Sequence, residues 1–149
     1  MSDLEKQDLK NKKVIVRVDL NVPLDDNDNV TDTTRIVACK ETVDLILEKG
    51  GTCILISHLG RPKGKENKFS LKKIVDTVSS VLNQPVFFYE DCIGQGAQEA
   101  ISKLDQGSII LMENLRFYQE ETLGDRVFAK YLSELGDIYV NDAFGTCHR

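Results

Sequence analysis

The chemistry suggested by this sequence comes from where its arginines fall. Of the six arginines, Arg126 lies inside a predicted helix and Arg17 in the first predicted strand. The other four follow a loop or the carboxyl end of a predicted strand: Arg35, Arg61, Arg116 and Arg149. An arginine keeps its charge at ordinary pH, and its planar guanidinium matches the oxygens of a carboxylate or a phosphate. Arginines gathered in this way would form a site for a small ligand with several negative charges.

The elements that must position these arginines alternate between strand and helix along the whole chain. Short apolar runs predict five strands, at 14–18, 52–56, 86–89, 108–112 and 138–140. Helical spacing and end signals predict helices at 33–49, 70–82, 96–104 and 123–135, and the polar runs at 25–29 and 61–68 are expected to be loops. Strands that are apolar on both faces, each followed by a helix, indicate an α/β fold, a three-layer Rossmann-like parallel sheet with helices on both faces.

This fold would bring the arginines together. In an open parallel sheet the carboxyl ends of the strands share one edge, and ligands bind in the crevice there. A single arginine is more simply explained as a surface residue paired with a nearby Asp or Glu. Four arginines at the same edge of one sheet favour an anion site.

Three further polar residues are expected at the same edge. His58 shares a tight glycine turn with Arg61, although a lone histidine is usually structural. Asp19 and Asn21 end the first strand, and their side chains could form hydrogen bonds with a ligand hydroxyl. An ordinary turn before Pro23 explains these two residues equally well.

The composition is that of one soluble globular domain. The chain has 149 residues, of which 41% are hydrophobic and 29% charged, and a formal net charge of −5. It can therefore bury a core and is not expected to be disordered. Without a basic tract it is a poor nucleic-acid binder, and its apolar runs are far shorter than the roughly 20 residues that span a membrane. Because residues 1–13 contain no signal-peptide core, a cytoplasmic location is expected.

The cysteines have no metal-binding spacing. No two of them form a C-x-x-C pair: Cys39, Cys53, Cys92 and Cys147. They are expected to be free thiols packed as small apolar groups, and no metal site is predicted. The acidic run at 25–29 lacks the glycine and glutamate of a calcium loop, and the segment 60–66 is one residue short of a phosphate loop.

Four segments resemble the signature segments of the phosphoglycerate kinase family. They are Arg17-Val-Asp-Leu-Asn-Val-Pro23, Ser57-His-Leu-Gly-Arg-Pro62, Glu113-Asn-Leu-Arg-Phe117 and Val140-Asn-Asp-Ala-Phe-Gly-Thr-Cys-His-Arg149. They occur in the order and spacing of the family, so the resemblance covers the chain from about residue 6 to its end.

The resemblance implies an enzyme of two α/β lobes that transfers a phosphoryl group between 1,3-bisphosphoglycerate and ADP, giving 3-phosphoglycerate and ATP in glycolysis. The N-terminal lobe would hold 3-phosphoglycerate, and the other lobe would hold Mg-ATP or Mg-ADP, so that no cofactor binds to this chain. Residues 1–149 are expected to be the N-terminal lobe, incomplete at its C-terminal end, monomeric and inactive alone. Phosphoryl transfer needs positioning and charge neutralisation more than a nucleophile, which suits an arginine cluster.

The resemblance also assigns roles to individual residues. Arg35 would lie nearest the transferring phosphoryl group and act as the catalytic residue. Asp19 and Asn21 would contact the triose. The implied substrate-binding residues are Asp19, Leu20, Asn21, Arg35, His58, Gly60, Arg61, Leu115, Arg116, His148 and Arg149.

Two other classes of protein are alternatives to the kinase. The first is a stand-alone anion-binding module that never catalyses. The second is an unrelated α/β regulatory domain, which would have to contain all four family segments by chance. Coding sequence that continues beyond Arg149 would favour the kinase over the module.

Overall fold

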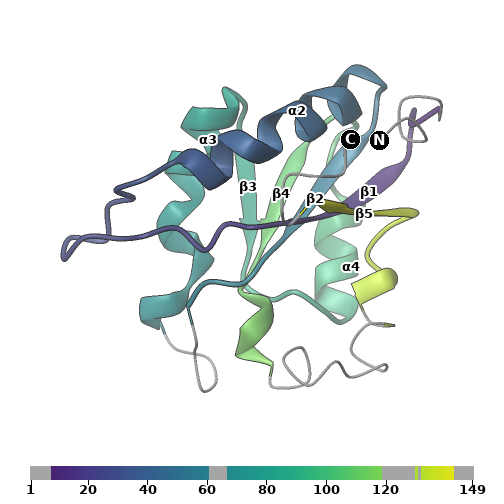
Figure 1. Cartoon of the computed structure of the whole chain (residues 1–149). Helices are drawn as coiled ribbons and strands as arrows, with labels where there is room; N and C mark the ends of the chain where they lie inside the picture. The colour runs from purple at the N-terminus through teal and green to yellow at the C-terminus, as the bar shows by residue number, and fades with distance from the viewer. Residues whose placement is uncertain (1–7, 61–66, 119–129, 131, 143–149) are drawn as a thin grey trace.

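A parallel sheet forms the centre of the molecule (Figure 1). The computed structural model describes residues 8–60, 67–118, 130 and 132–142. Within them, five strands lie in the order β3-β4-β2-β1-β5, and every pairing is parallel. Their bounds are β1 Lys13–Val18, β2 Thr52–Ile56, β3 Val86–Tyr89, β4 Ile109–Met112 and β5 Ile138–Asp142. All the predicted strands are present, each with ends within two residues of the expected ones.

Burial follows the position of each strand in the sheet. Two of the three inner strands, β2 and β4, are buried along their whole length, because side chains cover both of their faces. The outer strands β3 and β5 keep some exposed side chains, and Phe87 and Tyr139 are about half exposed, at 53% and 51%. The sheet is therefore apolar throughout only at its centre.

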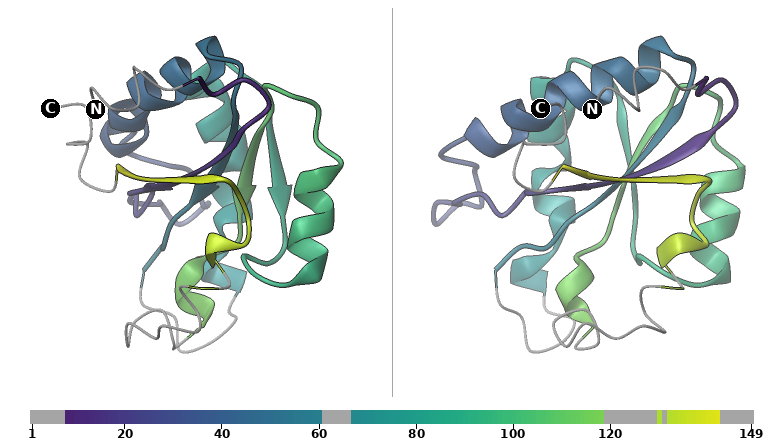
Figure 2. Two further views of the ribbon diagram at one scale, coloured as in Figure 1. Left: turned by 90° about the vertical axis from the view of Figure 1, so that its right-hand side faces the viewer. Right: turned by 45° about the vertical axis from the view of Figure 1, so that its right-hand side comes forward.

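Helices cover both faces of the sheet (Figure 2). The helices α2 (Thr34–Glu48) and α3 (Val75–Leu82) pack on one face, where Val43 and Val78 join the larger core. Helix α4 (Gln95–Ser102) packs on the other face, where Ile101 joins the second core. Successive residues of β1 point to opposite faces, so that Val14 belongs to the first core and Ile15 to the second. The predicted three-layer α/β fold is confirmed.

Several local predictions need correction. The helix expected at 70–82 is a 3-10 turn, η2 (Leu71–Ile74), followed by α3, although Ser70 caps it as expected by accepting a bond from the Lys72 amide. The segment expected to be a loop at 61–68 contains part of a second 3-10 turn, η1 (Asn67–Phe69). Arg35, which follows the loop after β1, lies in the first turn of α2, as the helix predicted at 33–49 implies.

The predicted helix at 123–135 falls mostly outside the described residues. Residues 130, 132 and 133 are helical, and Leu132 and Leu135 are buried in the core on the α4 side of the sheet. Among the described residues, no helix combines the length and the apolar character needed to cross a membrane.

Candidate functional site at the carboxyl edge of the sheet

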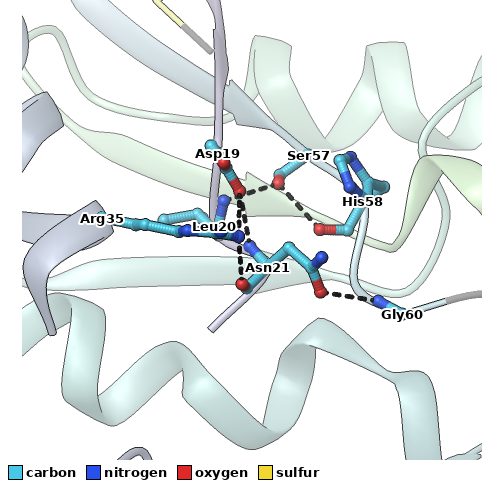
Figure 3. A network of polar contacts seen from close by, with 7 residues as sticks. All are labelled: Asp19, Leu20, Asn21, Arg35, Ser57, His58 and Gly60. Carbon is cyan, nitrogen blue, oxygen red and sulfur yellow. Dashed lines mark hydrogen bonds and ion pairs between the residues drawn. The ribbon is translucent and has the colours of Figure 1, made fainter. Parts of the chain in front are cut away.

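The segments that follow β1 and β2 lie side by side at the carboxyl edge of the sheet (Figure 3). Ser57, directly after β2, is buried, and its hydroxyl accepts a hydrogen bond from the Leu20 amide at 2.9 Å. The same hydroxyl donates to the carbonyl of His58 at 3.0 Å. The side chain of Asn21 closes the contact between the two segments, because its Oδ1 accepts the Gly60 amide at 2.8 Å.

Arg35 reaches this pair of segments from the start of α2. Its Nη1 lies 2.5 Å from the carbonyl oxygen of Asn21 and 3.3 Å from Oδ1 of Asp19. Asp19 Oδ1 also accepts the Asn21 amide at 3.0 Å, an arrangement typical of an Asx turn. The side chains of Arg35 and Asp19 are 50% and 27% exposed, so a ligand from solvent can reach the guanidinium.

The backbone conformation and the close packing at residue 60 require a glycine. Its φ of +64° is in the left-handed region, and a Cβ at this position would lie 2.5 Å from ring atoms of Phe69. The chain therefore turns sharply here and passes directly against an aromatic ring. This turn aims the Gly60 amide at Asn21.

Arg116 belongs to the segment after β4. It lies in the 3-10 turn η3 (Leu115–Phe117), and Leu115 is fully buried. The Leu115 amide donates to the carbonyl of Ser57 at 2.9 Å, which ties the β4 segment to the β2 segment. The structure therefore brings together the segments that carry eight of the predicted site residues: Asp19, Leu20, Asn21, Arg35, His58, Gly60, Leu115 and Arg116.

A shallow pocket opens beside this cluster. Its volume is about 320 Å³, and Asn21 and Gly60 form part of its wall together with Phe69 and Lys68. The ammonium of Lys68 lies 4.9 Å from the centre of the Phe69 ring, in a cation–π contact. The pocket is large enough for a small organic anion.

Sequence reasoning missed two residues that hold the site together. Ser57 and Asn114 are both fully buried and both bond to segments far away in the chain. The available signal was their position, because each is a polar residue that follows a strand of apolar side chains at the carboxyl edge.

Comparison with known proteins decides the family. The sequence model of phosphoglycerate kinase matches residues 3–149. The chain belongs to the phosphoglycerate kinase family. It is 51% identical to the chloroplastic phosphoglycerate kinase 2 of Arabidopsis thaliana, over 100% of this chain and 31% of that protein. It is 53% identical to a cytosolic phosphoglycerate kinase of Triticum aestivum, over 98% of this chain and 36% of that protein.

Solved structures of phosphoglycerate kinases have the same fold as this chain. The crystal structure of phosphoglycerate kinase from Pyrococcus horikoshii OT3 superimposes with a TM-score of 0.83 at 33% identity, over 98% of this chain and 37% of that one. The chain thus spans about a third of the length of the phosphoglycerate kinases it matches. These relatives include both cytosolic and chloroplastic proteins.

Three predicted site residues of the family pattern lie outside the described residues: Arg61, His148 and Arg149. The convergence of all four arginines therefore stays a prediction. Arg35 contacts the segment after β1, Arg116 lies in the segment after β4, and the segment after β2 lies between them and is bonded to both. Of the cysteines, Cys39 and Cys53 are free thiols buried in the core as expected, Cys92 is also buried, and Cys147 lies outside the described residues. Among the residues that the structure describes, no group of three or more His, Cys, Asp or Glu side chains could hold a metal ion.

Proposed function

We propose that residues 1–149 are the N-terminal, triose-binding lobe of a two-lobe phosphoglycerate kinase, and that the carboxyl edge of the sheet binds 3-phosphoglycerate. The match of the family model over residues 3–149 carries this proposal. The polar cluster of Asp19, Asn21 and Arg35 at that edge supports it, because it offers both a cation and hydroxyl partners to a small anion. The reaction of the whole protein would be phosphoryl transfer between 1,3-bisphosphoglycerate and ADP.

The roles divide according to chemistry. The Asp19 carboxylate would accept a hydrogen bond from the triose hydroxyl. The side-chain Nδ2 of Asn21 would donate to a ligand oxygen, because the Oδ1 of the same side chain already accepts from the Gly60 amide. The remaining substrate-binding residues would neutralise the carboxylate and the phosphate or present backbone groups to them: Leu20, His58, Gly60, Arg61, Leu115, Arg116, His148 and Arg149.

Arg35 is proposed as the catalytic residue. Among the described residues, its contacts at the edge of the site are made by one nitrogen, Nη1, which contacts both Asp19 and Asn21. A guanidinium in this position can follow charge as it develops on the transferring phosphoryl group. Magnesium-nucleotide would bind to the second lobe, and closure of the two lobes would exclude water from the reaction.

The test begins with binding by this chain. Calorimetric titration is expected to show weak binding of 3-phosphoglycerate, tighter than binding of inorganic phosphate, because several cations would converge on the two anionic groups of the ligand. With ADP and 1,3-bisphosphoglycerate the purified chain is expected to form no ATP. Failure to bind 3-phosphoglycerate, or steady ATP formation by the chain alone, would contradict the proposal. The protein is further proposed to be a cytoplasmic monomer, which fractionation and light scattering would test.

A further inference from the structure

The buried amide of Asn114 joins three separate segments at the carboxyl edge of the sheet. Its side chain is fully buried two residues after the end of β4. Its Nδ2 donates to the carbonyl of Leu59 at 2.8 Å and to the carbonyl of Phe69 at 2.9 Å. Its Oδ1 accepts the amide of Leu59 at 3.3 Å and the amide of Arg116 at 3.0 Å.

These four bonds use the whole capacity of the side chain. A primary amide has two N–H donors and one oxygen with two lone pairs, so nothing remains for a ligand. The bonds also require an amide in particular. An aspartate carboxylate would place an acceptor oxygen, in the position of Nδ2, against two carbonyl oxygens. An apolar side chain would leave four backbone groups without this partner, the two of Leu59 buried and those of Phe69 and Arg116 partly buried.

The bonded segments carry the candidate substrate-binding residues. Leu59 lies between His58 and Gly60, and both of its backbone groups are bonded to the Asn114 side chain. Phe69 presents the ring against which Gly60 packs. The amide of Arg116 is the fourth partner, so one side chain fixes the backbone of the β2 segment relative to that of the β4 segment.

The neighbouring residue holds Asn114 itself in place. Glu113 is 5% exposed, and its Oε1 accepts the amides of Asn114 and Leu71, each at 2.8 Å. Its Oε2 accepts the hydroxyl of Ser70 at 2.6 Å. The backbone around Asn114 is therefore anchored before any ligand arrives.

We propose that Asn114 is a positioning residue of the anion site, which sets the β2 segment with His58 and Gly60 against the β4 segment with Arg116 without touching the ligand. This inference rests on the proposed function only for the identity of the ligand. The bonds themselves belong to the chain without ligand.

The experiment compares Asn114→Asp with Asn83→Asp, the same chemical change at an exposed helix end outside the site. At pH 8 the Asn114→Asp chain is expected to bind 3-phosphoglycerate about tenfold or more weakly than the unaltered chain, because a buried acceptor faces two carbonyls. Burial raises the pKa of such a carboxyl group, so falling pH protonates it and restores one donor. The ratio of the two dissociation constants should therefore fall towards one as the pH is lowered. The Asn83→Asp chain should bind like the unaltered chain at every pH.

Equal affinity of the Asn114→Asp and unaltered chains at pH 8 would overturn the proposal, as would a loss that low pH does not reduce. If Asn114→Asp does not fold, the rates of amide hydrogen exchange in the unaltered chain test the positioning role of Asn114 instead. The amides of Leu59 and Arg116 and the side-chain amide of Asn114 must then exchange slowly without ligand, and rapid exchange would overturn the proposal.

The same exchange measurement separates this inference from the proposed function. If the unaltered chain does not bind 3-phosphoglycerate, the proposed function fails. The positioning role is then tested by hydrogen exchange alone. It is supported if Asn114→Asp removes the exchange protection of the Leu59 and Arg116 amides while Asn83→Asp leaves it intact, and it is wrong otherwise.

Discussion

Nη1 of Arg35 lies 3.3 Å from Oδ1 of Asp19, a contact between the first turn of α2 and the segment after β1, 16 positions apart in the chain. Both side chains are partly exposed, so the ion pair is screened by water and easily exchanged. An incoming phosphate or carboxylate can therefore replace Asp19 as the partner of Arg35 without a large cost. Asp19 would remain oriented by the Asn21 amide, which donates to the same oxygen.

Replacement of Arg35 should separate turnover from binding in the whole kinase. Arg35→Ala removes a cation proposed to act on developing charge, and kcat is expected to fall by about 10²–10³-fold with a much smaller rise in KM. Arg61→Ala should chiefly raise KM, because Arg61 is proposed to hold the ground-state anion. Steady-state kinetics of both variants would measure the division. Two variants that changed only KM would show that the proposed roles are wrong.

Substitution of Gly60 should damage both stability and binding. Gly60→Ala must adopt a left-handed φ and also place a Cβ within 2.5 Å of the Phe69 ring. Gly107→Ala is the matched control, because Gly107 has a φ of +84° and open space around its Cβ position. The control is expected to lose about 1–2 kcal/mol of unfolding free energy, while Gly60→Ala loses more and also weakens 3-phosphoglycerate binding. Denaturant unfolding and calorimetry would measure these effects, and equal losses in the two variants would contradict the assigned contact.

The buried thiols should resist alkylation in the folded chain. Burial raises the pKa of the Cys39 thiol to about 12 and raises that of Cys53 as well. Iodoacetamide at pH 8 is expected to label Cys39 roughly 10³-fold more slowly in the folded chain than in urea, because only the thiolate reacts. Labelling resolved by peptide mass spectrometry would measure the rates. Comparable labelling in both states would show that the thiols are accessible.

The Cys39 thiol should also make stability depend on pH at the alkaline end. Its folded pKa is higher than its unfolded pKa, so the folded state holds the proton more tightly. The stabilisation is complete below about pH 8.5 and is lost as the pH rises towards 12. Unfolding free energy measured between pH 8 and 11 should fall less steeply for Cys39→Ala than for the unaltered chain. Identical slopes would contradict the raised pKa.

Sulfate should compete with 3-phosphoglycerate beyond simple screening. The guanidinium groups of arginines bind sulfate oxygens directly. Sulfate is therefore expected to weaken 3-phosphoglycerate binding more than chloride does at the same ionic strength. Binding should persist from pH 8 to 6 and strengthen modestly, because a bound anion favours the charged form of His58. Protonation of the ligand's own phosphate would oppose this effect at the acid end. Calorimetry in the two salts at several pH values would test this, with His58→Gln as the control for the pH effect. Indifference to sulfate would mean that the arginines do not converge.

The sequence by itself determined the strands, the parallel sheet and the edge of the sheet at which the candidate site is proposed. Aliphatic runs such as 52–56 can only be satisfied by burial on both faces, which requires a parallel sheet with helices on each side. Parallel strands place their carboxyl ends at one edge, so the sequence alone predicts that Asp19, Arg35 and His58 lie at the same edge of the sheet. The apolar residues that define each strand and helix are close together in the sequence, so their spacing predicts these elements.

Only the tertiary structure decided the strand order and the bonds that shape the site. The bonds of Ser57 to Leu20 and of Asn114 to Leu59 span 37 and 55 positions, and no local pattern encodes a partner at that distance. The same reason applies at 70–82, where the 3-10 turn η2 precedes α3 and the Leu71 amide donates to the carboxylate of the buried Glu113, 42 positions away. Propensity acts on neighbouring residues, whereas a buried polar group must find its partner wherever the packed chain places one.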